Sequence, residues 1–343
     1  MVHKIEFLQK SDLKIVQEFI DHEWSPNHIL VKSKKLFDWQ YERNGDNYNF
    51  IISKRDDEII GVLGFINTFN YDKTLSKENI IWLALWKIKD GLGIPGLGLK
   101  MLNFLQENID HDAIAVNGIN LSHPPMYKAL GYLSDELSHF YTTHQNSKFK
   151  ILDEFNEYEH PKCINTGNEW LELNESKMRE LNQSLFKSNS YIKKSIIYFI
   201  NRYLKHPFYK YYIYLIQSPN SIEKSLISLR FDNAKGSKVI RIVDYFGNPE
   251  ILRNAGKGLN IIMKDNKVEY ADFWSYGIDN EIMESIGFKL ITKSNKIVVP
   301  NYFEPFIKSN ASIQFAFKSK KNKRNQNLII FKADGDQDRP NVV

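Results

Sequence analysis

Cysteine is scarce in this sequence, which has one, Cys163, among 343 residues. A disulfide needs two cysteines, so no disulfide framework forms within the chain, and we expect a reducing, cytoplasmic environment. A single thiol is also a poor basis for a zinc site, and we predict no bound metal. The first residues are charged and contain no apolar stretch, so we expect no signal peptide.

Long uncharged runs are also missing. No window of about 18 residues is free of charge, so we expect no membrane span. The most apolar candidate, residues 195–216, is interrupted by Arg202, Lys205 and Lys210. A helix on a membrane surface remains an alternative there, although a match to an earlier segment favours ordinary domain structure. The mild formal net charge of +5 and the lack of a nucleic-acid-binding motif favour a small-molecule ligand over nucleic acid. The oligomeric state is not indicated.

What the sequence does have is enough apolar residues, 42%, to build a core in each of about two domains. The first half alternates between strand and helix patterns. We predict strands at 3–8, 48–69 (a hairpin), 78–88, 112–119 and 137–144, and helices at 11–24, 32–42, 98–109 and 124–132.

The second half repeats this order of elements. Residues 37–52 can be laid on 199–214, so that Phe37 meets Phe199 and Tyr41 meets Tyr203. Later, Leu-Gly-Tyr at 130–132 corresponds to Ile-Gly-Phe at 286–288. The repeat predicts a duplicated α/β domain, with limits at 1–147 and 148–343.

Four glycines, Gly91, Gly93, Gly96 and Gly98, lie between a predicted buried strand and a predicted helix. The first N–H groups of a helix have no intrahelical partner, and glycines let an anion approach them closely. The loop is not a P-loop. It matches G-x-G-x-x-G, but no acidic residue ends the next strand, as a dinucleotide site requires. A phosphate site and a purely structural turn both remain open.

The sequence resembles the GNAT superfamily of N-acetyltransferases in two motifs. Gly96-Leu97-Gly98 matches the end of the loop pattern (Q/R)-x-x-G-x-(G/A), and Tyr127 with Gly131 and Tyr132 matches Tyr-x-x-x-Gly-(Phe/Tyr). Gly93 stands where the family has Gln or Arg. The element order extends the resemblance over residues 1–145, and it implies two tandem GNAT-like α+β domains with mixed, mostly antiparallel sheets flanked by helices.

The resemblance implies an acyl-CoA-dependent N-acyltransferase, acetyl-CoA being the expected cosubstrate and a small amine the acceptor that attacks the thioester directly. Tyr127 would protonate the leaving thiolate, and His123 would act as the base. Each residue also has a structural alternative: Tyr127 as a packing aromatic, His123 as a helix cap, Asn117 as a strand-end hydrogen-bond partner. The expected coenzyme-binding residues are Trp86, Ile88, Gly93, Ile94, Gly96, Leu97, Gly98 and Asn117.

The second half lacks both motifs, since Met283 stands at the position of Tyr127, and we predict that it binds no coenzyme. Its acidic tail, Asp334 to Arg339, has three alternatives: disorder, a metal loop, or a segment that folds back onto the acceptor site or a sheet end. The tail resembles the ends of tandem GNAT-like proteins of bacterial surface-polysaccharide loci. This favours an amino sugar or sugar nucleotide as the acceptor.

Two other functions remain open. One is a FemX-like aminoacyl transferase that uses charged tRNA, although the chain has neither a predicted helical arm nor a strongly basic groove. The other is a non-catalytic binding or assembly protein of polysaccharide biosynthesis.

Overall fold

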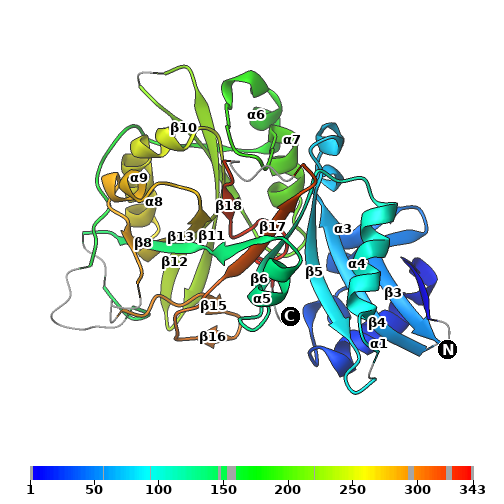
Figure 1. Ribbon diagram of the computed structural model, residues 1–343. Helices are drawn as coiled ribbons and strands as arrows, with labels where there is room; N and C mark the ends of the chain where they lie inside the picture. Colours follow the sequence, from blue (N-terminus) through cyan, green and yellow to red (C-terminus); the bar gives the residue numbers. More distant parts are fainter. Residues whose placement is uncertain are drawn as a thin grey trace. The chain divides into compact units, whose positions relative to one another are not determined.

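The computed structural model describes residues 3–56, 58–92, 94–145, 148–152, 160–219, 221–292, 297–321 and 327–340 (Figure 1). The chain forms two compact units. The first comprises Met1–Ser134, Phe315–Lys323 and Gly335–Val343, and the second Asp135–Gln314 and Arg324–Asp334. The sequence predicts two contiguous domains, 1–147 and 148–343, whereas the first unit includes two segments from near the C-terminus.

The first unit is built on a mixed sheet in the order β1-β3-β4-β5-β6-β17-β7, with β2 paired to β3. The β1–β3, β3–β4 and β4–β5 pairs are antiparallel, and β5–β6 is parallel. The strands are β1 (Lys4–Gln9), β2 (Glu42–Asn44), β3 (Asn47–Arg55), β4 (Glu58–Asn67), β5 (Ile80–Ile88), β6 (Ala113–Ile119), β7 (Leu133–Glu136) and β17 (Gln314–Ser319).

Helices cover both faces of this sheet. Side chains alternate along a strand, so Ile81 and Leu83 of β5 pack with the core beside α4, and Trp82 points to the opposite face. On that opposite face, Phe37 of α3 packs against Phe50 of β3. The helices are α1 (Leu13–Glu23), α2 (Ile29–Lys32), α3 (Lys34–Tyr41), α4 (Leu97–Asn108) and α5 (Pro124–Ala129), with short 3-10 turns at Lys10–Asp12, Thr68–Asn70 and Lys73–Ser76.

The second unit repeats the architecture in the order β9-β10-β11-β12-β13-β8-β14, with β18 paired to β13. Its strands are β8 (Ser138–Thr143), β9 (Leu171–Leu173), β10 (Tyr212–Gln217), β11 (Lys224–Ala234), β12 (Ser237–Phe246), β13 (Val268–Tyr276), β14 (Lys289–Leu290) and β18 (Ile330–Phe331), and β15 (Tyr302–Phe303) and β16 (Phe306–Ile307) form a separate hairpin. Its helices are α6 (Glu175–Arg179), α7 (Ile196–Phe199), α8 (Gly256–Asp265) and α9 (Asn280–Ser285), with a π-helical turn at Ile200–Leu204 and 3-10 turns at Gln183–Leu185 and Pro249–Asn254.

The strand expected to end the first half belongs to the second sheet. β8 pairs antiparallel with β13, from Ser138 opposite Ser275 to Thr143 opposite Tyr270. The corresponding place in the first sheet, next to β6, is taken by β17. Local periodicity predicts a strand at 137–144 but carries no information on its partner, because pairing is decided by residues more than 100 positions away.

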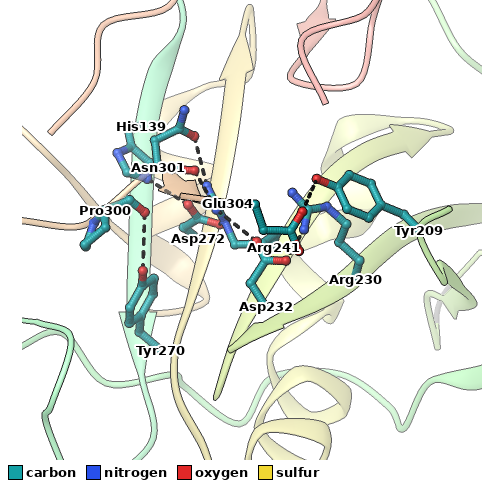
Figure 2. Close-up of polar contacts among 10 residues, drawn as sticks. All are labelled: His139, Tyr209, Arg230, Asp232, Arg241, Tyr270, Asp272, Pro300, Asn301 and Glu304. Atoms are coloured by element: carbon teal, nitrogen blue, oxygen red, sulfur yellow. Dashed lines mark hydrogen bonds and ion pairs between the residues drawn. The ribbon is translucent and has the colours of Figure 1, made fainter. Parts of the chain in front are cut away.

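A chain of buried charges crosses the second sheet (Figure 2). Arg241 donates from Nε to Asp272 at 2.6 Å and lies 3.3 Å from Asp232, which also pairs with Arg230. His139 contacts Asp272 at 3.1 Å. Burial acts to raise the pKa of Asp272, but Arg241 and His139 outweigh it and hold that pKa well below its usual range. Each charge therefore has a partner that offsets its desolvation.

The segment 195–216 forms α7, the π-helical turn and β10 within the second unit. Among the described residues, no helix combines the length and apolar character needed to cross a bilayer.

Candidate functional site

The parallel ladder between β5 and β6 ends halfway along β5. It runs from Ile80 opposite Ala113 to Leu83 opposite Val116. β5 continues to Ile88 and β6 to Ile119 without further pairs in the described ladder. The β4–β5 register shifts at this point, so Ala84 is an extra, bulged residue on β5. Bulges redirect a strand, and here the redirection accompanies the separation of β5 from β6.

A cavity of about 720 Å³ occupies the resulting gap. This volume lies within the range of small-molecule sites in proteins. The lining comes from the separated strand ends, the start of α4, one side of α5 and the end of α1. The residues are Glu23, Trp24, Ala84, Trp86, Lys87, Ile88, Gly96, Gly98, Leu99, Val116, Gly118, Ile119, Asn120, His123, Met126, Tyr127 and Leu130.

The start of α4 offers backbone N–H groups to this cavity. Its N-cap residue, Gly96, has a φ of +73° and makes no side-chain cap hydrogen bond. A Cβ atom on Gly98 would lie 3.2 Å from the Trp86 ring, so a glycine here lets the helix start pack tightly on β5. The first turn contains no acidic residue. Uncapped amides at the positive end of the helix dipole bind anions.

Four of the eight predicted coenzyme-binding residues line this cavity. Trp86, Ile88, Gly96 and Gly98 line it. The Leu97 side chain is buried in the core, so only its backbone is available there. Ile94 and Asn117 are not among the described lining residues, and Asn117 is buried on β6. Gly93 lies outside the described residues.

Tyr127 reaches the cavity from α5 and is 4% exposed. Its ring packs edge-on against Tyr132, with centroids 5.4 Å apart. Burial, and then the neighbouring Tyr132, raises the pKa of Tyr127 above its ordinary value, and burial raises the pKa of Tyr132 to about 12. Tyr127 is therefore protonated at neutral pH and can act as a proton donor.

His123 is the N-cap residue of α5, one helical turn before Tyr127, and its side chain is exposed. The ring makes no cap hydrogen bond. His123 and Tyr127 line the same cavity, so the structure brings the two predicted catalytic residues together.

A region that the motifs did not identify is the C-terminal segment 335–340, which packs on the first unit. A Cβ atom on Gly118, a lining residue with a φ of +85°, would lie 1.8 Å from Oε1 of Gln337. A Cβ atom on Gly335 would lie 3.3 Å from the Trp82 ring. The tail thus lies against β6 and against the Trp82 face of β5, and this excludes disorder for 335–340. The close glycine contacts are invisible to local sequence patterns.

Two charged residues of segment 335–340 pair with each other. Arg339 donates from Nε to Asp336 at 2.9 Å. Burial, together with the Arg339 charge, lowers the pKa of His28 to about 3, so His28 is neutral. Burial, and then the Asp336 charge, raises the pKa of Tyr41. Tyr41, His28 and the tail form a polar group that sequence spacing could not connect.

The corresponding gap of the second unit is filled by the chain itself. The parallel β12–β13 ladder ends at Ile242 opposite Phe273. Just beyond, β18 pairs with Ser275 and Tyr276 of β13, and the Ala333 amide donates to the Val243 carbonyl at 3.0 Å. A strand of the protein therefore lies where the first unit has its cavity.

The start of α8 is closed as well. The amides of Gly256 and Lys257 donate to Oγ1 and the carbonyl of Thr166, at 3.3 and 2.8 Å. A Cβ atom on Gly256 would lie 1.8 Å from the Ile164 carbonyl oxygen. Met283, at the position of Tyr127, is fully buried. In the second unit, the protein's own backbone therefore occupies both the gap between the parallel strands and the space at the start of the following helix.

Comparisons with known proteins identify the fold. No protein-family model matches the sequence. No curated protein matches it either. A solved GCN5-related N-acetyltransferase from Anabaena variabilis is 9% identical, with a TM-score of 0.55 over 93% of this chain and 73% of that one. A conserved protein of unknown function from Enterococcus faecalis is 10% identical, with a TM-score of 0.52 over the same shares.

At this level of identity the likeness concerns the fold alone. Together with the two sheets of equal strand order, it confirms the predicted fold class of two tandem GNAT-like α/β domains.

Proposed function

We propose that the first unit is an acyl-CoA-dependent N-acyltransferase, with acetyl-CoA as the donor and a small amine as the acceptor. One observation carries the proposal: the gap between β5 and β6 holds a cavity that also meets the uncapped start of α4 and the buried Tyr127. A phosphate site, an open strand edge and a proton donor are the three parts that such a reaction needs.

The residues present fit acyl-CoA. The free amides at the start of α4 suit a pyrophosphate. Beyond Leu83, β5 keeps its partner β4 on one edge and faces the cavity with the other. An open strand edge suits the amide groups of a pantetheine arm. Acyl-CoA supplies an activated thioester, whose carbon accepts the amine nitrogen while the carbon–sulfur bond breaks.

The chain's own residues handle the two protons of this exchange. Tyr127, whose pKa lies above its ordinary value, holds a proton at neutral pH that it can give to the departing thiolate. His123 lines the same cavity and can take the proton from the attacking amine, directly or through water. The Tyr127 phenolate regains a proton from solvent after product release.

The acceptor is inferred to bind beside the tail, which covers Trp82 on the face of β5 opposite α4 and contacts Gly118 of the cavity lining. The Trp82 indole nitrogen is buried and has no hydrogen-bond partner among the described residues. The tail residues Asp336 and Arg339 and the side chain of Tyr41 bring polar groups to this face. An amino sugar or sugar nucleotide for a surface polysaccharide is the acceptor class we favour, and the resemblance of the tail alone supports it.

The experiment compares Tyr127→Phe with Tyr132→Phe while thiol release from acetyl-CoA is measured with a panel of amino sugars. Both residues are buried and share one ring contact, but only Tyr127 lines the cavity. Tyr127→Phe should lower kcat at least 10-fold with coenzyme affinity unchanged, and Tyr132→Phe should keep most of the turnover. Equal rates for wild type and Tyr127→Phe would remove Tyr127 from the reaction.

A further inference from the structure

The second unit contains a separate cavity of about 720 Å³ with a strongly basic lining. It lies beside the start of β12, the end of α8 and the start of β13. The gap that β18 fills lies toward the other ends of β12 and β13. Five of its lining residues are lysines: Lys148, Lys150, Lys238, Lys264 and Lys267. We propose that this cavity binds a compact, multiply charged phosphate compound.

Among the described residues, little negative charge offsets these lysines. In the described part of the chain, none of the five makes an ion pair; Lys150 donates to the Gly236 carbonyl at 3.0 Å, and Lys238 lies over the Phe231 ring. The acid in the described part of the lining is Glu269, whose Oε1 accepts from the amides of Ile151 and Leu152, both at 2.8 Å. That carboxylate is therefore held by the backbone instead of by a lysine.

His144, another lining residue, has a lowered pKa, as expected beside a cluster of lysines. Burial lowers its pKa, and the charges of Lys264 and Lys162 lower it further. The positive field that disfavours a charged imidazole favours an anion. Like charges gathered around a hollow repel one another until an anion neutralises them, and lysine serves as a point charge for phosphate groups.

The shape and lining narrow the class of ligand. The cavity is concave, so it suits a small soluble molecule better than the flat surface of a membrane. The described lining contains no Phe, Tyr or Trp on which a nucleobase could stack. A compact compound with clustered phosphates therefore fits better than a ligand recognised through its base.

A structural explanation exists for part of the cluster. Lys264 lies in the last turn of α8, where cations interact favourably with the helix dipole. A matched control separates this effect from ligand binding. Lys177 is the control for Lys264, because both are exposed and lie in the last turn of a helix. Lys224 is the control for Lys238, because both are half-buried near the start of a strand.

The test is calorimetric titration of the full chain with inorganic tripolyphosphate at about physiological ionic strength. We expect saturable binding, weakened at least 10-fold by Lys238→Gln/Lys264→Gln and less than 2-fold by Lys177→Gln/Lys224→Gln. Both variants should retain the acetyl-CoA affinity of the wild type, which serves as the folding control.

Two results would overturn the proposal. One is the absence of saturable tripolyphosphate binding by wild type. If phosphatidic-acid vesicles bind the protein in that case, the phosphate comes from a lipid headgroup and not from a small soluble compound. The other is an equal loss of affinity in both double variants. The weaker binding would then come from the lower net charge of the chain and not from a site at this cavity.

Discussion

Leu83 on β5 lies opposite Val116 on β6, and this is the last pair of their parallel ladder. One residue later, Ala84 bulges out of the β4–β5 register. The cavity begins at this point, with Ala84 and Val116 both in its lining. In the second unit, Ile242 and Phe273 end the equivalent ladder, but β18 follows immediately. The same fold therefore carries one open and one filled gap.

This difference predicts a stoichiometry. One molecule of acetyl-CoA should bind per chain, because β18 and Thr166 occupy the second unit's counterpart of the site. Calorimetry with the concentration of active protein known should give a binding ratio close to one. A ratio close to two would mean that β18 leaves its place.

Gly98 should be intolerant of a side chain. A Cβ atom there would lie 3.2 Å from the Trp86 ring, and a valine would add two more carbons in the same tight space. Gly98→Val should move the start of α4 away from β5 and weaken acetyl-CoA binding at least 10-fold, as measured by calorimetry. The double variant Gly98→Val/Trp86→Ala removes the obstructing ring and should regain part of the lost affinity. An unchanged affinity in Gly98→Val would count against a phosphate site at these amides.

Gln337 should affect the acceptor more than the coenzyme. Its side chain lies directly on Gly118, at the end of the gap. Gln337→Ala should raise the acceptor KM several-fold and leave acetyl-CoA affinity unchanged. Gln106→Ala, a half-buried glutamine on α4 that is not among the lining residues, is the control. Identical acceptor kinetics in the two variants would place the tail outside the acceptor site.

Stability should fall in mild acid, and His139 should account for part of the fall. Burial lowers its folded-state pKa to about 4, whereas an unfolded histidine titrates near 6.5. Between these values the unfolded chain binds more protons, so the unfolding free energy drops as pH falls from about 6.5 to 4, by on the order of 3 kcal/mol for this group. Urea unfolding followed by tryptophan fluorescence would measure it; Trp274, whose ring centroid lies 3.8 Å from that of His139, is one of the six tryptophans that contribute to the signal. His139→Gln should reduce the slope without abolishing it, because His28 also has a lowered pKa and titrates in the same range. An unchanged slope would exclude a contribution from His139.

The sequence predicts the elements of the site well because they are local. The unbroken apolar run at 78–88 and the glycines after it place β5 within 78–88, α4 within a residue or two of 98–109, and Tyr127 on a short helix. The exchange of β8 and β17 could not be predicted, since strand partners far apart in the chain leave no local trace. The position of the tail could not be predicted either. Gln337 contacts Gly118 and Gly335 contacts Trp82, and each pair is separated by more than 200 positions in the sequence.

For the second unit, the sequence predicts only that coenzyme binding is lost, and it does so through missing motifs. The missing G-x-G turn and Met283 predict the loss of a coenzyme site. They do not predict that Thr166 would cap α8 or that Ile330 and Phe331 would enter the gap, because capping and strand insertion depend on tertiary contacts.

The most direct test of the acyl-CoA site is calorimetric titration of wild type, Gly96→Glu and Gly91→Glu with acetyl-CoA, longer acyl chains also being tried. Both glycines have positive φ, +73° and +75°, and open space within 4 Å, so the two substitutions impose similar strain and the same charge. Only Gly96 caps α4 and lines the cavity. Wild type and Gly91→Glu should bind acetyl-CoA, and Gly96→Glu should not. No binding by the folded wild type, or equal binding by all three proteins, would show that the start of α4 is not an acyl-CoA site.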